Sequence, residues 1–158
     1  MTGKSLRIGL PEDAFLIAEM VSAMLVELAD YGGHALSQDE ERDEYLLGLI
    51  RAQLDDSCYR YLLAESRQGE LLGVVGGESR SSLPVFTSKT MLHISALYVS
   101  PAHRRSGIGR SLLQAILDWG CEVGCEEADL NVLARNLASA LYESLGFEVF
   151  QRQLIRRL

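Results

Sequence analysis

The stretch from Met91 to Leu113 constrains most strongly what this chain can fold into. Residues 91–99 are apolar, include β-branched and aromatic side chains, and end at the turn signal Ser100-Pro101, a pattern that predicts a strand. From Ile108 onward, apolar residues recur at helical spacing, which predicts an amphipathic helix packed on a sheet. The loop between them is basic and contains glycine: Arg104-Arg105-Ser106-Gly107-Ile108-Gly109.

This junction between strand and helix has the chemistry of an anion site. The first N–H groups of a helix lack partners and carry a partial positive charge, and glycines let a ligand approach the backbone. Phosphate is a usual ligand there, and Arg104 and Arg105 add charge where a pyrophosphate would lie. The spacing matches neither the dinucleotide-binding nor the P-loop fingerprint. Taken alone, the loop is explained equally well as a solvated turn.

Two sequence blocks resemble the GNAT N-acetyltransferase superfamily. Leu97-Tyr-Val-Ser-Pro-x-x-Arg-Arg-x-Gly-Ile-Gly is similar to its acetyl-CoA-binding motif, whose core is Arg/Gln-x-x-Gly-x-Gly/Ala. The block from Asn131 to Phe147 is similar to Asn-x-x-Ala-x-x-Leu-Tyr-x-x-x-Gly-Phe, with a shift of one residue at the alanine. The resemblance covers roughly residues 59–150, and residues 1–58 match only in general layout.

The resemblance implies acetyl-CoA as co-substrate, bound where a bulged central strand splays from its parallel neighbour. Backbone groups of Leu97 and Val99 should then hydrogen-bond the pantetheine arm. Asn136 should reach the same side of the molecule, although a plain helix N-cap explains this residue as well. The residues expected to surround the pyrophosphate, chiefly through backbone N–H groups, are Arg104, Arg105, Gly107, Ile108, Gly109 and Arg110.

The resemblance also suggests two catalytic residues. Tyr142 occupies the position of the family's acid tyrosine, and a phenol with a pKa of about 10 stays protonated at neutral pH. Packing beside the apolar stripe of its helix is the alternative. His93 lies 11 residues before Arg104, where several members carry a glutamate or histidine base. A half-buried histidine without a catalytic role, with deprotonation through water, is the alternative there.

Charge is distributed unevenly along the chain. The net charge of −7 argues against non-specific nucleic-acid binding. Residues 79–117 nevertheless contain no acidic residue, which fits a polyanionic cofactor docking in this window, although chance clustering gives the same pattern. The basic residues of the window are Arg80, Lys89, Arg104, Arg105 and Arg110.

Length and composition favour one domain over residues 1–158. No apolar run approaches the ~20 residues of a membrane helix, and the N-terminus lacks a signal-peptide layout, so a cytoplasmic protein without a membrane part is expected. Three cysteines are too few for a disulfide framework. Cys121 and Cys125 lie one helical turn apart without further ligands, so no metal site is expected.

The remaining patterns predict an α/β fold. A strand is expected at 6–10, a helix from Pro11 to about Tyr31, and a second helix opened by a capping box of Ser37 and Glu40. The order is that of the GNAT acyl-CoA N-acyltransferase fold, a mixed sheet with a splayed parallel pair and about four helices. The other expected elements are strands at 59–65, 71–76, 91–99 and 128–133, a polar loop at 79–90, a short helix capped by Asn136, and one or two closing strands within 147–158.

The function expected from these features is transfer of the acetyl group of acetyl-CoA to a primary amine of a small molecule or peptide. A catalytically idle acetyl-CoA sensor or scaffold is the alternative. A generic nucleotide-binding module is disfavoured by the missing P-loop lysine. The apolar and basic residues 154–158 permit a homodimer. Acidic residues on the expected acceptor side favour a cationic amine, or form a solvated face: Glu27, Asp30, Asp39, Glu40 and Glu41, with Tyr31 and His34.

Overall fold

A computed structural model describes residues 3–87 and 89–158 and contains a five-stranded sheet. Its strands follow the chain order, and the first four are antiparallel neighbours. The last pair is parallel, as the mixed-sheet prediction requires. The strands are β1 (Lys4–Ile8), β2 (Tyr59–Ser66), β3 (Leu71–Ser81), β4 (Thr90–Val99) and β5 (Glu127–Leu130).

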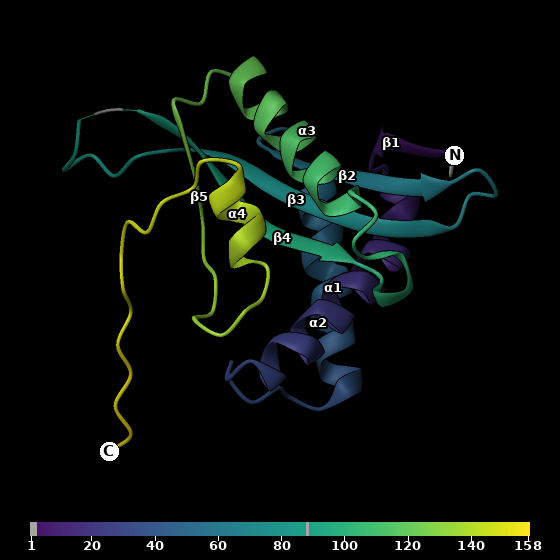
Figure 1. Cartoon of the computed structure of the whole chain (residues 1–158), viewed down its shortest axis with the longest axis horizontal. Helices are drawn as coiled ribbons and strands as arrows, with labels where there is room; N and C mark the ends of the chain where they lie inside the picture. Colours follow the sequence, from purple (N-terminus) through teal and green to yellow (C-terminus); the bar gives the residue numbers. More distant parts are fainter. Residues whose placement is uncertain (1–2, 88) are drawn as a thin grey trace.

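Helices cover both faces of the sheet, with α3 on one face and α1 and α2 on the other (Figure 1). Each layer has its own apolar core: Leu112 and Ile116 of α3 are fully buried on one face, and Ile17 and Ile50 on the other. The helices are α1 (Ala14–Asp30), α2 (Asp39–Leu54), α3 (Ile108–Glu122) and α4 (Ser139–Ser144), with 3-10 turns η1 (Pro11–Asp13) and η2 (Pro101–His103).

A β-bulge interrupts β4 at Ser95. Gly76 of β3 pairs with Ala96 and Gly77 pairs with Ile94, so Ser95 is the extra residue. Because side chains alternate along a strand, the extra residue exchanges the two faces. Before the bulge, Ile94 packs in the core beneath α3. After it, Ala96 packs beneath α1 and α2.

The two parallel strands separate just beyond the bulge. Pairing between β4 and β5 ends at Ile94 and Leu130, whereas β4 continues to Val99. From Ser95 to Val99 no strand of the described residues lies on the β5 side of β4. The parallel pair is therefore splayed, as expected from the resemblance.

Several element boundaries differ from the sequence prediction. The closing strands expected within 147–158 were wrong, since residues 147–158 form no strand and their trace runs away from the sheet (Figure 1). A strand needs a partner for its hydrogen bonds, and this segment lies beside none. β3 extends into the range of the expected polar loop as far as Ser81, because residues 78–81 pair with 90–93. The capping box was also wrong, since Gln38 is the N-cap of α2 without a side-chain hydrogen bond.

Candidate active site

The start of α3 presents several backbone donors that its own helix does not use. Gly107 is the N-cap, in the left-handed conformation with φ 81°, and has no side chain to cap the helix. The first backbone bond into the helix runs from the Ser111 N–H to the Gly107 carbonyl, at 3.0 Å. The N–H groups of Ile108, Gly109 and Arg110 therefore have no intrahelical partner. This is the arrangement that binds anions.

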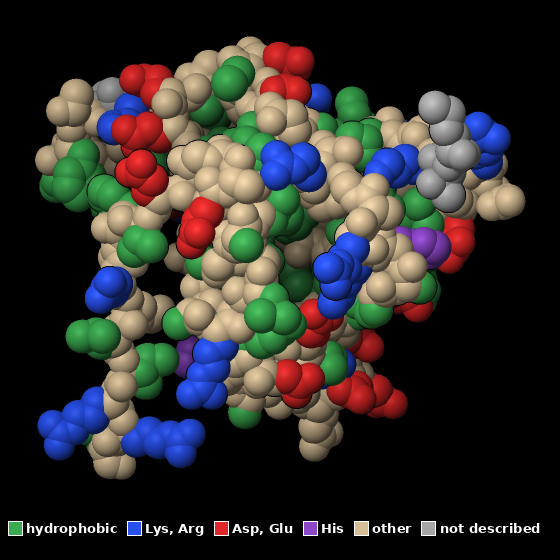
Figure 2. All heavy atoms as spheres, viewed as in Figure 1, with side chains coloured by type: hydrophobic (Ala, Val, Ile, Leu, Met, Phe, Trp, Pro, Cys, Tyr) green, Lys and Arg blue, Asp and Glu red, His purple; other side chains and the backbone are tan. Residues whose placement is uncertain are grey.

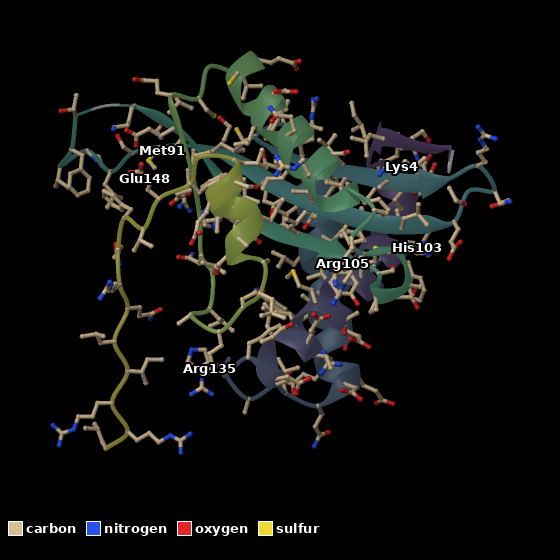
Figure 3. All side chains as sticks on the ribbon, in the orientation of Figure 1. Lys4, Met91, His103, Arg105, Arg135 and Glu148 are labelled. Carbon is tan, nitrogen blue, oxygen red and sulfur yellow. The ribbon has the colours of Figure 1, made fainter. Side chains whose placement is uncertain are left out.

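Two further cations lie beside this loop. Arg105 adopts a left-handed backbone with φ 60°, and its side chain is exposed. Lys4 of β1 donates from Nζ to the Ser106 carbonyl oxygen at 2.6 Å. Figure 3 places Lys4, His103 and Arg105 at the same end of the molecule. No sequence pattern pointed to Lys4, because it lies 102 residues from its partner.

Arg104 is held by an acidic partner in the same molecule. Its guanidinium binds both carboxylate oxygens of Glu27 in α1, at 2.8 and 2.6 Å, and its Nε donates to the Val99 carbonyl oxygen at 2.9 Å. This hydrogen bonding lowers the pKa of the Glu27 carboxyl. The Arg104 side chain thus braces the loop against α1, and pyrophosphate binding by Arg104 stays a prediction.

The splayed edge of β4 exposes backbone groups that could bind a linear ligand. The Ser100 N–H donates to the Leu72 carbonyl of β3 at 3.0 Å. Since hydrogen-bonded and non-bonded pairs alternate in an antiparallel ladder, Tyr98 also bonds to β3, whereas Leu97 and Val99 point their backbone groups the other way. That direction is the open side, where β5 has ended.

Tyr142 lies close to the same helix terminus. The neighbouring Leu141 packs near Gly109, where an added Cβ would meet the Leu141 side chain at 3.4 Å. The Tyr142 ring makes an edge contact with Phe147, and burial raises the pKa of its phenol. Within the described chain, no hydrogen-bond partner is found for its hydroxyl.

Arg110 and Asn136 attach the α4 segment to this region. Arg110 donates to Ser144 Oγ at 2.6 Å, linking α3 to α4. The Asn136 Oδ1 accepts the Ala138 N–H at 2.9 Å and stabilises the turn before α4, but the N-cap of α4 is Ala138, so the predicted capping of this helix by Asn136 was wrong. A role of Asn136 toward pantetheine stays a prediction. Figure 2 shows a hollow near the middle of the view, with hydrophobic side chains in its depth and basic side chains on its right-hand rim.

His93 lies on the face of β4 opposite to α3, one residue before β4 and β5 separate. Its Nδ1 lies 2.9 Å from Asp129 Oδ1 of β5, and its side chain is 17% exposed. Glu78 of β3 is its cross-strand neighbour. The basic loop at residues 104–109 (the anion loop), the open edge of β4 and Tyr142 are therefore gathered near the start of α3. His93 approaches the point where β4 and β5 separate after Ile94 and Leu130 (the fork) from the opposite face of the sheet. The partner Asp129 had no signal in the sequence.

Some features are absent from the residues that the structure describes. No helix there is both long and apolar enough to cross a membrane. No group of three metal-ligating His, Cys, Asp or Glu side chains was found among the same residues. Cys58, Cys121 and Cys125 are free thiols.

Comparison with known proteins agrees with the resemblance. Residues 22–147 match the sequence profile of the "Acetyltransferase (GNAT) family". Aminoglycoside N(6')-acetyltransferase type 1 of Salmonella typhimurium is 27% identical over 71 residues, covering 44% of this chain and 49% of that protein. Glucosamine 6-phosphate N-acetyltransferase of Trypanosoma brucei brucei is 30% identical over 83 residues, covering 51% and 55%. The matched stretch thus spans about half the length of these curated relatives.

A solved structure shows the same fold. The aminoglycoside N-acetyltransferase AAC(6')-Iy in complex with CoA superposes with a TM-score of 0.77 at 18% identity, covering 100% of this chain and 96% of that one. At this identity the likeness concerns the fold alone. Since the family profile matches well over half of the residues, the chain belongs to the GNAT acetyltransferase family.

Proposed function

We propose that this protein transfers the acetyl group of acetyl-CoA to a primary amine. The observation that carries the proposal is the open edge of β4 at Leu97 and Val99, which leads directly to the uncapped start of α3. A pantetheine amide chain needs exposed backbone groups, and a pyrophosphate needs clustered N–H donors. Both occur here on β4 and α3 of one GNAT chain, which are separated by the turn η2 and the basic loop. The complex of AAC(6')-Iy with CoA supports the choice of co-substrate.

Binding would use the chain in the following way. The N–H groups of Ile108, Gly109 and Arg110 would donate hydrogen bonds to the pyrophosphate oxygens, with Lys4 and Arg105 adding positive charge beside them. The backbone groups of Leu97 and Val99 would hold the pantetheine arm. The thioester would then lie near Ser95, where β4 and β5 part and both faces of the sheet can be reached.

Acetyl transfer requires two proton movements. Bound acetyl-CoA supplies an activated acetyl thioester, and an amine attacks it only after losing a proton, because an ammonium has no lone pair. The imidazole of His93 would accept that proton at Nε2, since Nδ1 faces Asp129. A backbone N–H of the bulged strand would stabilise negative charge on the carbonyl oxygen. As the C–N bond forms and the C–S bond breaks, the Tyr142 hydroxyl would protonate the departing sulfur.

The acceptor is proposed to be a small molecule or a peptide carrying a primary amine. Names of the relatives point to aminoglycosides and glucosamine 6-phosphate as the first compounds to test. Glu27 no longer counts toward an acidic acceptor surface, because Arg104 neutralises it. We also propose that the whole chain forms one domain and that the protein is located in the cytoplasm. Three free thiols among the described residues support that location.

The alternative function is that of an idle acetyl-CoA sensor of the same fold, which would keep the binding loop and lack turnover. A homodimer is favoured by the C-terminal segment, where Phe150, Leu154 and Ile155 are 98%, 92% and 74% exposed. Exposed apolar side chains in such number commonly mark a contact surface.

The experiment that tests the proposed function has two stages. The melting temperature is measured with acetyl-CoA, CoA or ATP, and free thiol release is then followed with aminoglycosides, glucosamine 6-phosphate, polyamines and lysine peptides. We expect stabilisation by acetyl-CoA and CoA but not by ATP, and thiol release with one amine class. Binding without turnover on any amine would favour the sensor. Absence of any effect of CoA would overturn the proposal.

A further inference from the structure

Four polar side chains form a row across the sheet at the end where β4 and β5 still pair. The strand registers place Tyr59, Glu78, His93 and Asp129 opposite one another on successive strands. They share the face of the sheet on which α1 and α2 pack, since Tyr61, two residues along from Tyr59, belongs to that core. His93 lies in the middle of this row, with a carboxylate residue on each neighbouring strand.

Only one of these two carboxylates contacts the histidine by a hydrogen bond that the structure records. The Asp129 Oδ1 lies 2.9 Å from His93 Nδ1, and the other oxygen, Oδ2, accepts from Arg80 Nη2 at 3.4 Å. Each oxygen of Asp129 therefore has its own partner. The His93 side chain is 17% exposed and the Asp129 side chain 44%, so the histidine is the more enclosed of the two.

The contact has a consequence for the imidazole. An ionised carboxylate can only accept hydrogen bonds, so the nitrogen that faces Asp129 carries the proton. In a neutral imidazole the other nitrogen, Nε2, then holds the lone pair. The choice of tautomer follows from this partner, and a proton taken up at Nε2 would leave an imidazolium beside a negative charge.

The pair of His93 and Asp129 also lies at a particular place in the sheet, next to the point where β4 and β5 separate. The pair His93 and Asp129 is the last but one in the β4–β5 register, and the strands separate after Ile94 and Leu130. The bulged residue Ser95 follows two positions after His93. Ile94 and Leu130 face the core beneath α3, so His93 and Asp129 are the pair nearest the fork on the opposite face of the parallel ladder.

We propose that Asp129 is a positioning residue, which holds His93 in the tautomer with a free Nε2 so that this nitrogen can take the proton of the acceptor amine. The inference rests on the proposed function for its catalytic meaning. The tautomer itself does not depend on turnover, so the two can fail separately.

The tautomer is tested by NMR of the full chain labelled with ¹⁵N-histidine, without substrates, at a pH where His93 is neutral. Long-range ¹H–¹⁵N correlations distinguish the protonated ring nitrogen from the bare one, and a His93→Ala spectrum assigns the signals. We expect a proton on Nδ1 in the wild type and its loss from Nδ1 in Asp129→Ala. A proton on Nε2 in the wild type, or an unchanged spectrum in the variant, would overturn the proposal whatever the enzyme acetylates.

Steady-state kinetics test whether Asp129 acts on the reaction through His93. Asp129→Ala is expected to lower kcat by about tenfold or more, with the KM for acetyl-CoA unchanged. Asp129→Asn, which keeps an acceptor oxygen for Nδ1, should recover part of that loss. In a His93→Ala background the Asp129→Ala change should cost nothing further. An equal loss in both backgrounds would mean a merely structural role and would overturn the proposal.

A matched control lies on the same strand. Glu127 forms an ion pair with Lys89, and it is opposite Met91 in the β4–β5 register, two positions before the pair under test. The change Glu127→Gln removes a carboxylate of β5 without touching His93. It should leave both the imidazole spectrum and kcat as in the wild type. If kcat fell as far as in Asp129→Ala, the loss of any carboxylate from β5 would be enough to slow the reaction, and the proposal would be overturned.

Discussion

Arg104 and Glu27 join the loop after β4 to helix α1 through a bidentate ion pair, with N–O distances of 2.8 and 2.6 Å. The two residues lie 77 positions apart in the chain. Glu27 also lies near the Tyr31 hydroxyl, at 3.5 Å. Because the adjoining residues form the anion loop, this pair connects α1 mechanically to the proposed co-substrate site.

Replacing Glu27 by Gln should therefore destabilise the fold in a pH-dependent way. With the two side chains 37% and 30% exposed, we expect a loss of about 1 kcal/mol in unfolding free energy at neutral pH. The hydrogen bonds from Arg104 lower the pKa of Glu27 below its ordinary value of about 4.3, so the contribution is present above that pH and disappears as the pH falls through the folded-state pKa. Melting curves of wild type and Glu27→Gln should differ most near pH 7 and converge in acid. A difference that persists below the folded-state pKa of Glu27 would contradict this.

Gly107→Ala separates binding from folding. A side chain at φ 81° costs about 1–2 kcal/mol of backbone strain, and the same strain applies at Gly124, where φ is 84° and nothing lies within 4 Å of an added Cβ. Both variants should melt earlier by similar amounts. Only Gly107→Ala should weaken acetyl-CoA binding, measured by calorimetry, because only Gly107 belongs to the anion loop. Equal affinities of the two variants for acetyl-CoA would show that the anion loop does not bind this ligand.

Tyr142→Phe should affect catalysis and leave stability nearly unchanged. The ring contact with Phe147 is retained, and no recorded hydrogen bond of the described residues is lost. We expect kcat to fall by about 10²-fold, within the range for one general acid. Since burial raises the pKa of this phenol above its ordinary value of about 10, it stays protonated through neutral pH, and any alkaline loss of rate below pH 10 must come from another group. Tyr45→Phe, which alters an exposed tyrosine of α2, is the control.

Asp13→Asn should be the most destabilising of these changes. Asp13 is buried, binds both terminal nitrogens of Arg7 at 2.6 and 2.8 Å, and accepts the Leu10 N–H at 2.8 Å. Because Arg7 is 35% exposed, we expect a loss of about 2–3 kcal/mol, below the ~3–5 kcal/mol of a fully buried pair. Chemical denaturation provides the measurement, with the exposed Glu12→Gln as control.

The pH dependence of that loss follows from the same contacts. Hydrogen bonding to Arg7 lowers the pKa of Asp13, so its contribution is complete above the ordinary carboxyl pKa of about 3.9 and is lost at lower pH. Wild type and Asp13→Asn should therefore converge in acid. An undiminished gap below the folded-state pKa would show that the hydrogen bonds matter and the charge does not.

Local signals explain which parts of the fold the sequence predicts. The segment from β4 to α3 was confirmed, because a β-branched strand, a proline turn, a left-handed glycine and a helical apolar stripe are each encoded by neighbouring residues. The parallel pairing of β4 and β5 was predicted from the fold of the family that the two motifs resemble, and it was confirmed. The closing strands were wrong because residues 147–158 have strand-like side chains but no neighbouring edge, and pairing depends on what lies beside a segment in space.

The partners of the site residues could not be predicted in the same way. Arg104, His93 and the Ser106 carbonyl find Glu27, Asp129 and Lys4 at sequence separations of 77, 36 and 102 residues. No spacing rule connects residues so far apart. Their contacts follow from strand order and register, which only the folded chain supplies.

The bulge at Ser95 also determines which mutations β4 can tolerate. On its two sides, residues of opposite numerical parity face α3, so Ile94 and Leu97 share a core although three positions separate them. Deleting one residue there would invert every following side chain of the strand at once, whereas substituting one would alter a single contact. Evolution can therefore change single side chains of this strand more readily than its length, and a deletion or insertion between the bulge and Val99 should be tolerated less well than a substitution there.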